Sequence, residues 1–301
     1  MHDPLEIFGT VTDTVAAIVD TEPEPQSSTP CSDWNYAQLL WHVVGGDRLF
    51  AGVLTGRASF PTSGRMAPDP DQPPPSPADY RAASTGLATV LADAEVRAGT
   101  FEVPAGRLTG DQVIVLRSVE HFLHGWDLAK AGGAPTIGLE PVATALDGPA
   151  RRLLTAVGDR ALAERRPFAS SVEIEADATP LERLVAAFGR DPRWAPDPIA
   201  GYARITELFV QHDDVELPDG TRRGFGADGL RVRNQVFACT HRGRLMIKLP
   251  ADEVDELIAT GLGAPLSKPG QRPMREWVLV PFDGAAGRRV DRAYAFVSGQ
   301  G

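Results

Sequence analysis

The sequence SVEHFLHGWDLA, residues 118–129, decides how the N-terminal part of this chain is interpreted. Glu120 and His124 stand four residues apart in a segment that reads as a helix. Because a helix turns about 100° per residue, both side chains point along one face, where a carboxylate and an imidazole can bind one ion. A second imidazole, His42, lies in another apolar helical segment, LLWHVV at residues 39–44. If these two helices pack side by side, the three groups meet inside a helical core.

Other helices are expected around this pair. The first has an apolar stripe at steps of three and four residues, formed by Leu5, Phe8, Val11, Val15 and Ile18. The His42 helix is expected to start at a cap on Ser32 or Asp33, and a third helix is expected over residues 78–97. The Glu120 helix is expected to start at Gly110 or Asp111 and to end at Gly132-Gly133, before a fifth helix over residues 141–162. Seven prolines in residues 59–77 favour a loop or flap there.

Between Glu164 and Pro198 the sequence consists of short segments rich in proline and arginine, and a domain boundary is expected near residues 195–200. Beyond a short helix at about 201–212, apolar residues alternate with period two in three segments between residues 230 and 249. Tight turns are expected at Asn234-Gln235 and Arg242-Gly243, so the three segments form consecutive antiparallel strands. A helix at 252–259, a strand at 277–280 and a helix at 289–297 follow. The fold class is therefore α plus α+β: a four-helix bundle over residues 1–198, then a small α+β domain with an antiparallel sheet over residues 199–301.

Composition argues against several functional classes. The 301 residues carry a net charge of −10 and the pI is near 5.1, so neither nucleic acid nor an anionic membrane is expected as a partner. The sequence shows no apolar run of about 18 residues and no secretory signal, which predicts a cytoplasmic protein. Cys31 and Cys239 are expected to be free thiols. Cys31 precedes a helix start, which can lower a thiol pKa, but a lone cysteine is more often a small buried hydrophobe.

The three predicted ligands are nitrogen and carboxylate donors without a thiolate. Such a set suits Zn²⁺, and also Ni²⁺, Fe²⁺ or Mn²⁺, and three protein ligands leave a position open as in catalytic sites. The alternative is that Glu120 and His124 form an ordinary solvated pair. His121 is interpreted as a substitute ligand or a solvent-facing residue, and Asp127 as a partner of the ligands or a helix-end cap. The sequence assigns no catalytic side chain.

Three segments carry a resemblance to a known family: TPCSDW at 29–34, LLWHVVGG at 39–46 and HGWDLA at 124–129. Together they resemble the N-terminal domain of mycothiol-dependent maleylpyruvate isomerases, which are DinB-like metal-binding bundles. The segments ATPLERL at 178–184 and FGRDP at 188–192 are similar to the end of one subfamily, so the resemblance spans about residues 5–195. It implies a divalent ion, typically zinc, bound by His42, Glu120 and His124, with mycothiol as a candidate co-substrate.

The C-terminal part resembles a second family, the N-terminal domain of TfoX/Sxy-type proteins. The resemblance spans about residues 201–301 and rests on FGADGL at 225–230, VFA at 236–238 and GRLMIK at 243–248. That family is associated with the regulation of competence. Because a shared fold does not transfer a function, no regulatory role is carried over to this chain.

Three functional hypotheses follow from the residues and the resemblance. The leading one is a metal-dependent enzyme, a mycothiol-dependent thiol S-transferase or isomerase that acts on a small electrophilic molecule. The alternative is a non-catalytic metal- or ligand-binding regulatory protein that acts through the TfoX-like domain. A third keeps only the scaffold and uses its pocket for an unrelated hydrolysis. The expected partners are a small-molecule substrate and a low-molecular-weight thiol, and a homodimer is left open.

Overall fold

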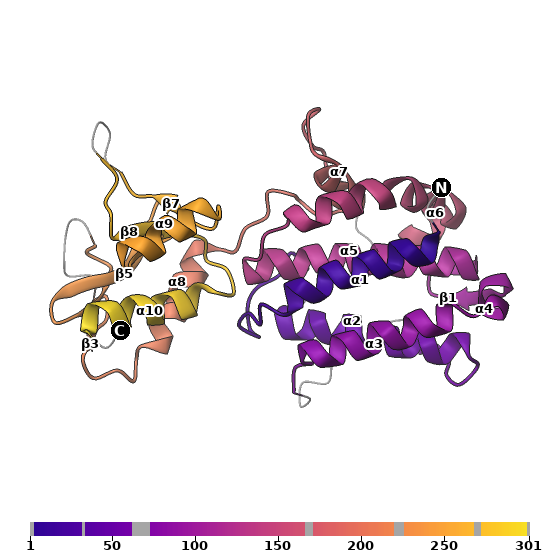
Figure 1. Ribbon diagram of the computed structural model, residues 1–301, viewed down its shortest axis with the longest axis horizontal. Coiled ribbons are helices and arrows are strands. Elements are labelled where there is room, and N and C mark those ends of the chain that lie inside the picture. The colour runs from indigo at the N-terminus through magenta and orange to yellow at the C-terminus, as the bar shows by residue number, and fades with distance from the viewer. Residues whose placement is uncertain are drawn as a thin grey trace. The chain divides into compact units, whose positions relative to one another are not determined.

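The computed structural model describes residues 3–31, 34–61, 73–165, 171–219, 226–267 and 272–299, without the side chains of residues 137 and 158–165. Figure 1 shows the chain from the N-terminus to the C-terminus. The chain divides between Trp194 and Ala195 into two compact units, and each is described by itself. The first unit is mostly helical, with one two-stranded hairpin, and the second contains a six-stranded sheet.

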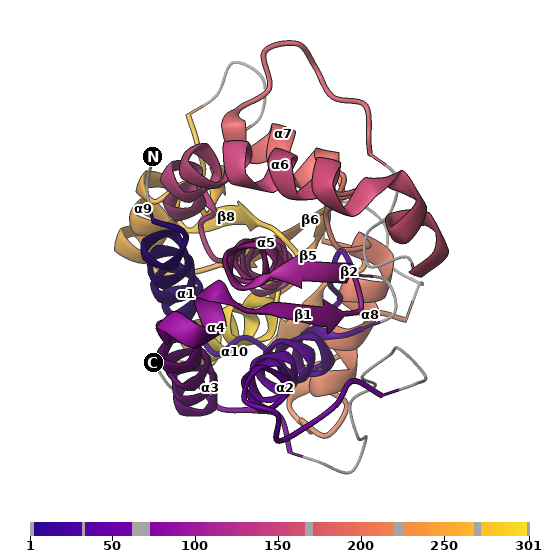
Figure 2. The same ribbon diagram turned by 90° about the vertical axis from the view of Figure 1, so that its right-hand side faces the viewer.

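Four helices lie side by side in the first unit and are seen end-on in Figure 2: α1 (Pro4–Val19), α2 (Tyr36–Leu54), α3 (Pro77–Leu91) and α5 (Gly110–Gly132). Helices α1 and α2 each contact both α3 and α5. Helix α6 (Glu140–Arg165) follows the short 3₁₀ helix η1 (Ile137–Leu139) and packs against α5 and α1, and α7 (Pro180–Ala187) packs on α6. This arrangement makes α5 the central helix of the unit.

Local sequence signals set the ends of the two helices that carry the predicted ligands. Helix α2 starts after Asn35, which forms a capping box with Gln38. The expected caps, Ser32 and Asp33, lie outside the described residues, as does the 62–72 part of the expected proline-rich flap. Helix α5 starts after Thr109, which forms a capping box with Gln112, and ends at Gly133 with φ 70°.

The single helix expected over residues 78–97 is wrong. Helix α3 ends at Leu91, and a separate helix α4 (Ala94–Ala98) begins after Asp93. The Asp93 backbone is extended, with ψ 129°, and its carboxylate accepts hydrogen bonds from the backbone N–H groups of Glu95 and Val96. An aspartate at this position satisfies the first N–H groups of a new helix better than it continues an old one. The hairpin of β1 (Thr100–Val103) and β2 (Gly106–Thr109) then leads directly into α5.

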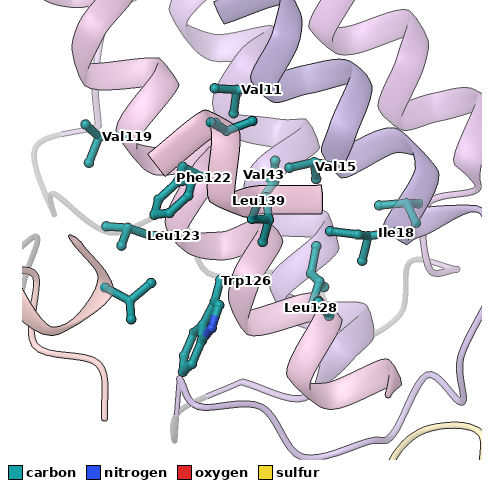
Figure 3. Close-up of a cluster of buried hydrophobic side chains, with 14 of the residues drawn as sticks. Val11, Val15, Ile18, Val43, Val119, Phe122, Leu123, Trp126, Leu128 and Leu139 are labelled. Carbon is teal, nitrogen blue, oxygen red and sulfur yellow. The ribbon is translucent and has the colours of Figure 1, made fainter. Parts of the chain in front are cut away.

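The core of the helical unit is built around α5. Figure 3 shows side chains of α5, among them Phe122, Leu123 and Trp126, gathered with side chains of α1 such as Val15. The two helices lie close together at Gly125, where an added Cβ would lie 2.3 Å from Val15 Cγ2. Burying this many large apolar side chains, each worth about 1.5–3 kcal/mol, fixes α5 against its neighbours.

The second unit contains a six-stranded antiparallel sheet with the strand order β3-β4-β5-β6-β8-β7. The strands are β3 (Val215–Glu216), β4 (Leu230–Val232), β5 (Gln235–His241), β6 (Arg244–Lys248), β7 (Ala264–Pro265) and β8 (Trp277–Val280). The helices are α8 (Pro198–Leu208), α9 (Ala251–Ala259) and α10 (Ala286–Ser298), and α10 packs against β4, β5 and β6.

One of the two expected turns in the sheet lies one residue earlier than expected. The first turn is Arg233-Asn234, because these two residues have φ values of 51° and 63° and Gln235 already pairs with Val232. Two consecutive residues with positive φ form the turn type that matches the twist of a hairpin. The second turn, Arg242-Gly243, is confirmed by φ values of 50° and 75°.

The helical N-terminal part and the antiparallel C-terminal sheet of the expected α plus α+β class are confirmed. A DinB-like bundle and a TfoX-like domain stay predictions. Among the described residues, no helix has both the length and the apolar character needed to cross a membrane.

Candidate metal centre

The three predicted ligands come from two neighbouring helices. Helix α2 carries His42, and α5 carries Glu120 and His124 one turn apart. One ligand atom from each side chain can be chosen so that all three atoms lie within 4.8 Å of one another. The contact between α2 and α5 therefore brings together groups that are 78 residues apart in the sequence.

The spacing of these atoms suits a small divalent cation. His124 Nε2 lies 3.5 Å from Glu120 Oε2. Two ligands of a tetrahedral zinc ion, with bonds of about 2.0–2.1 Å, lie roughly 3.3 Å apart. Two imidazoles and one carboxylate also form a donor set that catalytic zinc sites use. The residues present therefore fit a divalent ion.

The two α5 ligands are desolvated and form an ion pair. The side chains of Glu120 and His124 are 16% and 9% exposed. Burial would raise the pKa of Glu120, but the hydrogen bond and charge of His124, together with Arg117 and His42, lower it to about 2. Burial would lower the pKa of His124, yet its hydrogen bonds to Asp127, Cys31 and Glu120 hold it well above the ordinary value. Glu120 is therefore an anion at neutral pH, as a metal ligand requires.

Asp127 contacts the Nδ1 side of His124, and Arg190 contacts Asp127. His124 Nδ1 donates to Asp127 Oδ2 at 3.1 Å, and Arg190 Nη2 donates to the same oxygen at 3.1 Å. The Cys31 thiol lies 3.4 Å from this oxygen and accepts from Arg190 Nη2 at 3.7 Å. The interpretation of Asp127 as a partner of a ligand thus agrees with its position.

Cys31, His124 and Asp127 form a second group whose ligand atoms lie within 4.8 Å of one another. The Arg190 guanidinium contacts two of them and already places a positive charge there. A cation at this position would be repelled by Arg190. The group of His42, Glu120 and His124 is therefore the better metal centre.

A short turn places Cys31 and Trp34 beside the centre. The Thr29 hydroxyl donates to the backbone oxygens of Cys31 and Trp34, and Trp34 N donates to Cys31 O. The Trp34 ring stacks on His42 with centroids 4.5 Å apart and planes inclined by 31°. Trp34 therefore covers one face of the His42 ring, and the His42 residue as a whole is half-buried.

The interpretation of His121 as a substitute ligand or a solvent-facing residue is wrong. Its side chain is 0% exposed, and it lies in a buried network that contains no predicted ligand. His121 Nε2 contacts the Asp47 carboxylate at 2.9 Å, Nδ1 lies 2.9 Å from the Tyr80 hydroxyl, and Arg117 donates to Asp47 at 2.8 Å. The network joins α2, α3 and α5 through hydrogen bonds between buried polar groups.

Two other histidines lie outside the centre. His212 is exposed and contacts the rings of Phe209 and Tyr294, and His241 is partly buried at the end of β5. Both belong to the second unit, and neither is part of a metal-ligating group among the described residues.

The sequence of this chain is similar to one protein-family model and to two known proteins. The model of the mycothiol maleylpyruvate isomerase N-terminal domain matches residues 6–129. Two proteins from strains of Mycobacterium tuberculosis, named uncharacterized protein MT0763 and uncharacterized protein Rv0738, are each 31% identical to this chain over 197 residues. The match covers 64% of this chain and 100% of each mycobacterial protein. The chain belongs to the family of these two proteins. No solved structure matches it.

The matched residues 6–129 contain His42, Glu120, His124 and Asp127. Arg190 lies beyond this range. Sequence reasoning assigned no role to Arg190 or Trp34, and Cys31 was interpreted only as a thiol at a helix start or a small buried hydrophobe. All three fall in segments that carried the family resemblance, which is the signal that could have identified them. Spacing alone could not, because Arg190 and Cys31 are 159 residues apart.

Proposed function

We propose that this protein binds one divalent metal ion, most favourably Zn²⁺, through His42, Glu120 and His124. We further propose that it uses the ion as a mycothiol-dependent thiol S-transferase or isomerase acting on a small electrophilic molecule. The convergence of the three ligand atoms within 4.8 Å carries the proposal. The match of residues 6–129 to the mycothiol maleylpyruvate isomerase N-terminal domain supports the choice of thiol.

The residues of this chain have separable roles in the proposed function. Glu120 supplies a negative charge that balances the cation, and the stacked Trp34 ring restricts the movement of His42. The partly exposed His42 and Glu120 leave a side through which a small thiol can approach. When bound, the ion would supply the positive charge that keeps a thiol ionised at neutral pH.

Elemental analysis of the purified protein tests the metal centre. We expect about one divalent ion per chain in the wild type and its loss in His42→Ala. His241→Ala is the matched control, because it removes a histidine from the second unit and should keep the ion. An equal metal content in all three proteins would refute the assignment.

Thiol consumption tests the chemistry. Metal-loaded protein is incubated with mycothiol and maleylpyruvate, an epoxide or a chloroaromatic, with glutathione in parallel as the comparison thiol. We expect either isomerisation of maleylpyruvate with the thiol regenerated, or consumption of mycothiol as it forms a thioether with the epoxide or chloroaromatic, and we expect His42→Ala to abolish the reaction. Full metal occupancy without turnover on any of these electrophiles would reject the enzymatic part and favour the non-catalytic alternative.

We also propose that residues 1–198 form a DinB-like metal-binding domain and residues 199–301 a TfoX-like domain. A small-molecule substrate and a low-molecular-weight thiol are the proposed partners, with a homodimer left open. Deleting residues 201–301 distinguishes the two hypotheses for this domain. Loss of a stable macromolecular partner on deletion supports the regulatory alternative, whereas loss of turnover supports a part in the enzyme.

A further inference from the structure

The orientation of the His124 ring depends on Asp127, which is in turn paired with Arg190. An imidazole ring can rotate about its Cα–Cβ and Cβ–Cγ bonds, so that either nitrogen can face the centre. In this structure Nδ1 donates to Asp127 Oδ2 at 3.1 Å, and Nε2 faces Glu120 Oε2 at 3.5 Å. The bond to Asp127 therefore selects the nitrogen that faces His42 and Glu120.

Asp127 is fully buried, and Arg190 compensates its charge together with His124. Its side chain is 0% exposed, that of Arg190 is 10% exposed, and the two form an ion pair at 3.1 Å. The other carboxylate oxygen, Oδ1, has no hydrogen-bond partner among the described residues. The orientation of the carboxylate thus depends on the three donors that converge on Oδ2, namely His124, Arg190 and Cys31.

Arg190 is fixed by the turn that ends α7. Its backbone N donates to Val185 O at 3.0 Å, its Nη1 donates to Phe188 O at 3.2 Å, and Gly189 adopts φ 82°. A glycine takes this left-handed conformation without the penalty that a side chain incurs. The guanidinium is therefore held at both ends, by its own backbone and by Asp127.

We propose that Asp127 and Arg190 are positioning residues of the metal centre: Arg190 fixes the Asp127 carboxylate, and Asp127 fixes the His124 ring. This inference rests on the proposed function and extends the centre beyond residue 129, to the turn that ends α7. A chain lacking either residue keeps all three ligands but loses the support of one of them.

Zinc affinity of the full-length protein tests the proposal. We expect Asp127→Ala to weaken zinc binding about 10–100-fold, the range found for groups that orient metal ligands. Asp127→Asn keeps an acceptor oxygen and should restore part of the loss. Arg97→Ala is the control for Arg190→Ala, because Arg97 pairs with Asp3 and Asp111 in the same unit and should leave affinity unchanged. Circular dichroism of each variant verifies that it is folded.

A double-mutant cycle shows whether Arg190 acts through Asp127. We expect the double variant, with alanine at both positions, to bind zinc as weakly as Asp127→Ala alone, because Arg190 has no separate route to His124. Losses that add, or a folded Asp127→Ala variant that binds zinc within about twofold of the wild type, would overturn the proposal.

Nuclear magnetic resonance of the metal-free protein decides the proposal without metal. The His124 Nδ1 proton should exchange slowly with solvent in the wild type and in Arg97→Ala. In Asp127→Ala this proton should exchange rapidly, because its acceptor is gone. In Arg190→Ala it should exchange faster than in the wild type. Absence of divalent-metal binding by the wild type would defeat the proposed function only. A rapidly exchanging Nδ1 proton in the wild type would defeat the positioning role.

Discussion

In the helical unit, two buried tyrosines differ in whether the hydroxyl group has a hydrogen-bond partner. Tyr80 is 0% exposed, and its hydroxyl lies 2.9 Å from His121 Nδ1. Tyr36 is 5% exposed, and its hydroxyl has no hydrogen-bond partner among the described residues. A buried polar group contributes to stability only when it is paired.

The first prediction compares Tyr80→Phe with Tyr36→Phe. Tyr80→Phe leaves His121 Nδ1 buried without its partner, and we expect the free energy of unfolding to fall by about 1–3 kcal/mol. Tyr36→Phe removes a buried hydroxyl without a hydrogen-bond partner and should leave stability unchanged or slightly higher. Urea denaturation followed by circular dichroism measures both. Equal losses would show that the buried network does not stabilise the fold.

The second prediction concerns Asp283 in the second unit. Burial raises the pKa of this carboxyl above 3.8, although Arg289 donates to it at 2.7 Å and partly opposes the shift. Because the folded pKa is raised, the stabilising contribution is complete below about 3.8 and is lost as the pH rises through the folded value. Asp283→Asn cannot ionise, so its stability relative to the wild type should increase between pH 4 and pH 7. Denaturation curves at both pH values check this, and a decrease would contradict it.

The roles of individual residues were only partly accessible from the sequence. The i, i+4 spacing predicted that Glu120 and His124 share a face, and the structure places them on one. The environment of His121 could not be predicted, because its partners Asp47 and Tyr80 belong to other helices. Helix periodicity gives the direction of a side chain but not the group it meets, which depends on how the helices pack.

At the scale of elements, the close approach of α1 and α5 depends on one residue without a side chain. A Cβ on Gly125 would lie 2.3 Å from Val15 Cγ2, and Val15 is 0% exposed and stiff. A Cβ on Gly86, which is exposed in α3, would meet nothing within 4 Å. A larger residue is therefore expected to clash at Gly125 and to be tolerated at Gly86.

The third prediction compares Gly125→Ala with Gly86→Ala. Both changes gain about 1 kcal/mol of helix propensity. At Gly125, overpacking costs about 1–3 kcal/mol, and we expect a net loss of stability of up to about 2 kcal/mol. Gly86→Ala should stabilise the protein by about 0.5–1 kcal/mol. Thermal unfolding of the two variants measures the difference, and a stabilised Gly125→Ala would show that α1 and α5 can separate without cost.

Helices with strong local sequence signals could be predicted. A helix boundary that depends on a single capping residue, such as the break at Asp93, could not. The apolar stripe gave α1, and Gly132-Gly133 gave the end of α5. The break at Asp93 was missed because the apolar period continues across it. The competing signal, an aspartate that caps the following N–H groups, was present in the sequence but is common inside helices as well.

At the scale of the whole molecule, each hydrophobic cluster of described residues belongs to one unit. The clusters around Phe122 and Phe8 lie in the helical unit, and those around Phe237 and Met246 lie in the sheet unit. The proposed metal ligands all belong to the helical unit. A ligand stabilises the part of a protein that forms its site.

The fourth prediction is that zinc protects only the helical unit from hydrogen exchange. At a zinc concentration 100 times Kd, the stabilisation is about 2.7 kcal/mol. Peptides from residues 3–194 should show slower exchange, those from residues 195–299 should not, and His42→Ala should show no zinc effect. Mass spectrometry of exchanged peptides measures this, and equal protection of the β5 and β6 peptides would contradict it.

The turn at Arg190 has a consequence for how the molecule is made. Cys31 and Arg190 are separated by 159 residues. Ribosomes add about 5–20 residues per second, so roughly 8–32 s pass between the synthesis of Cys31 and that of Arg190. A nascent chain that ends before Glu120 carries His42 without its fellow ligands, and one that ends before Arg190 leaves Asp127 without its cation. The proposed metal centre therefore reaches its full expected affinity only after the turn that carries Arg190 has left the ribosome.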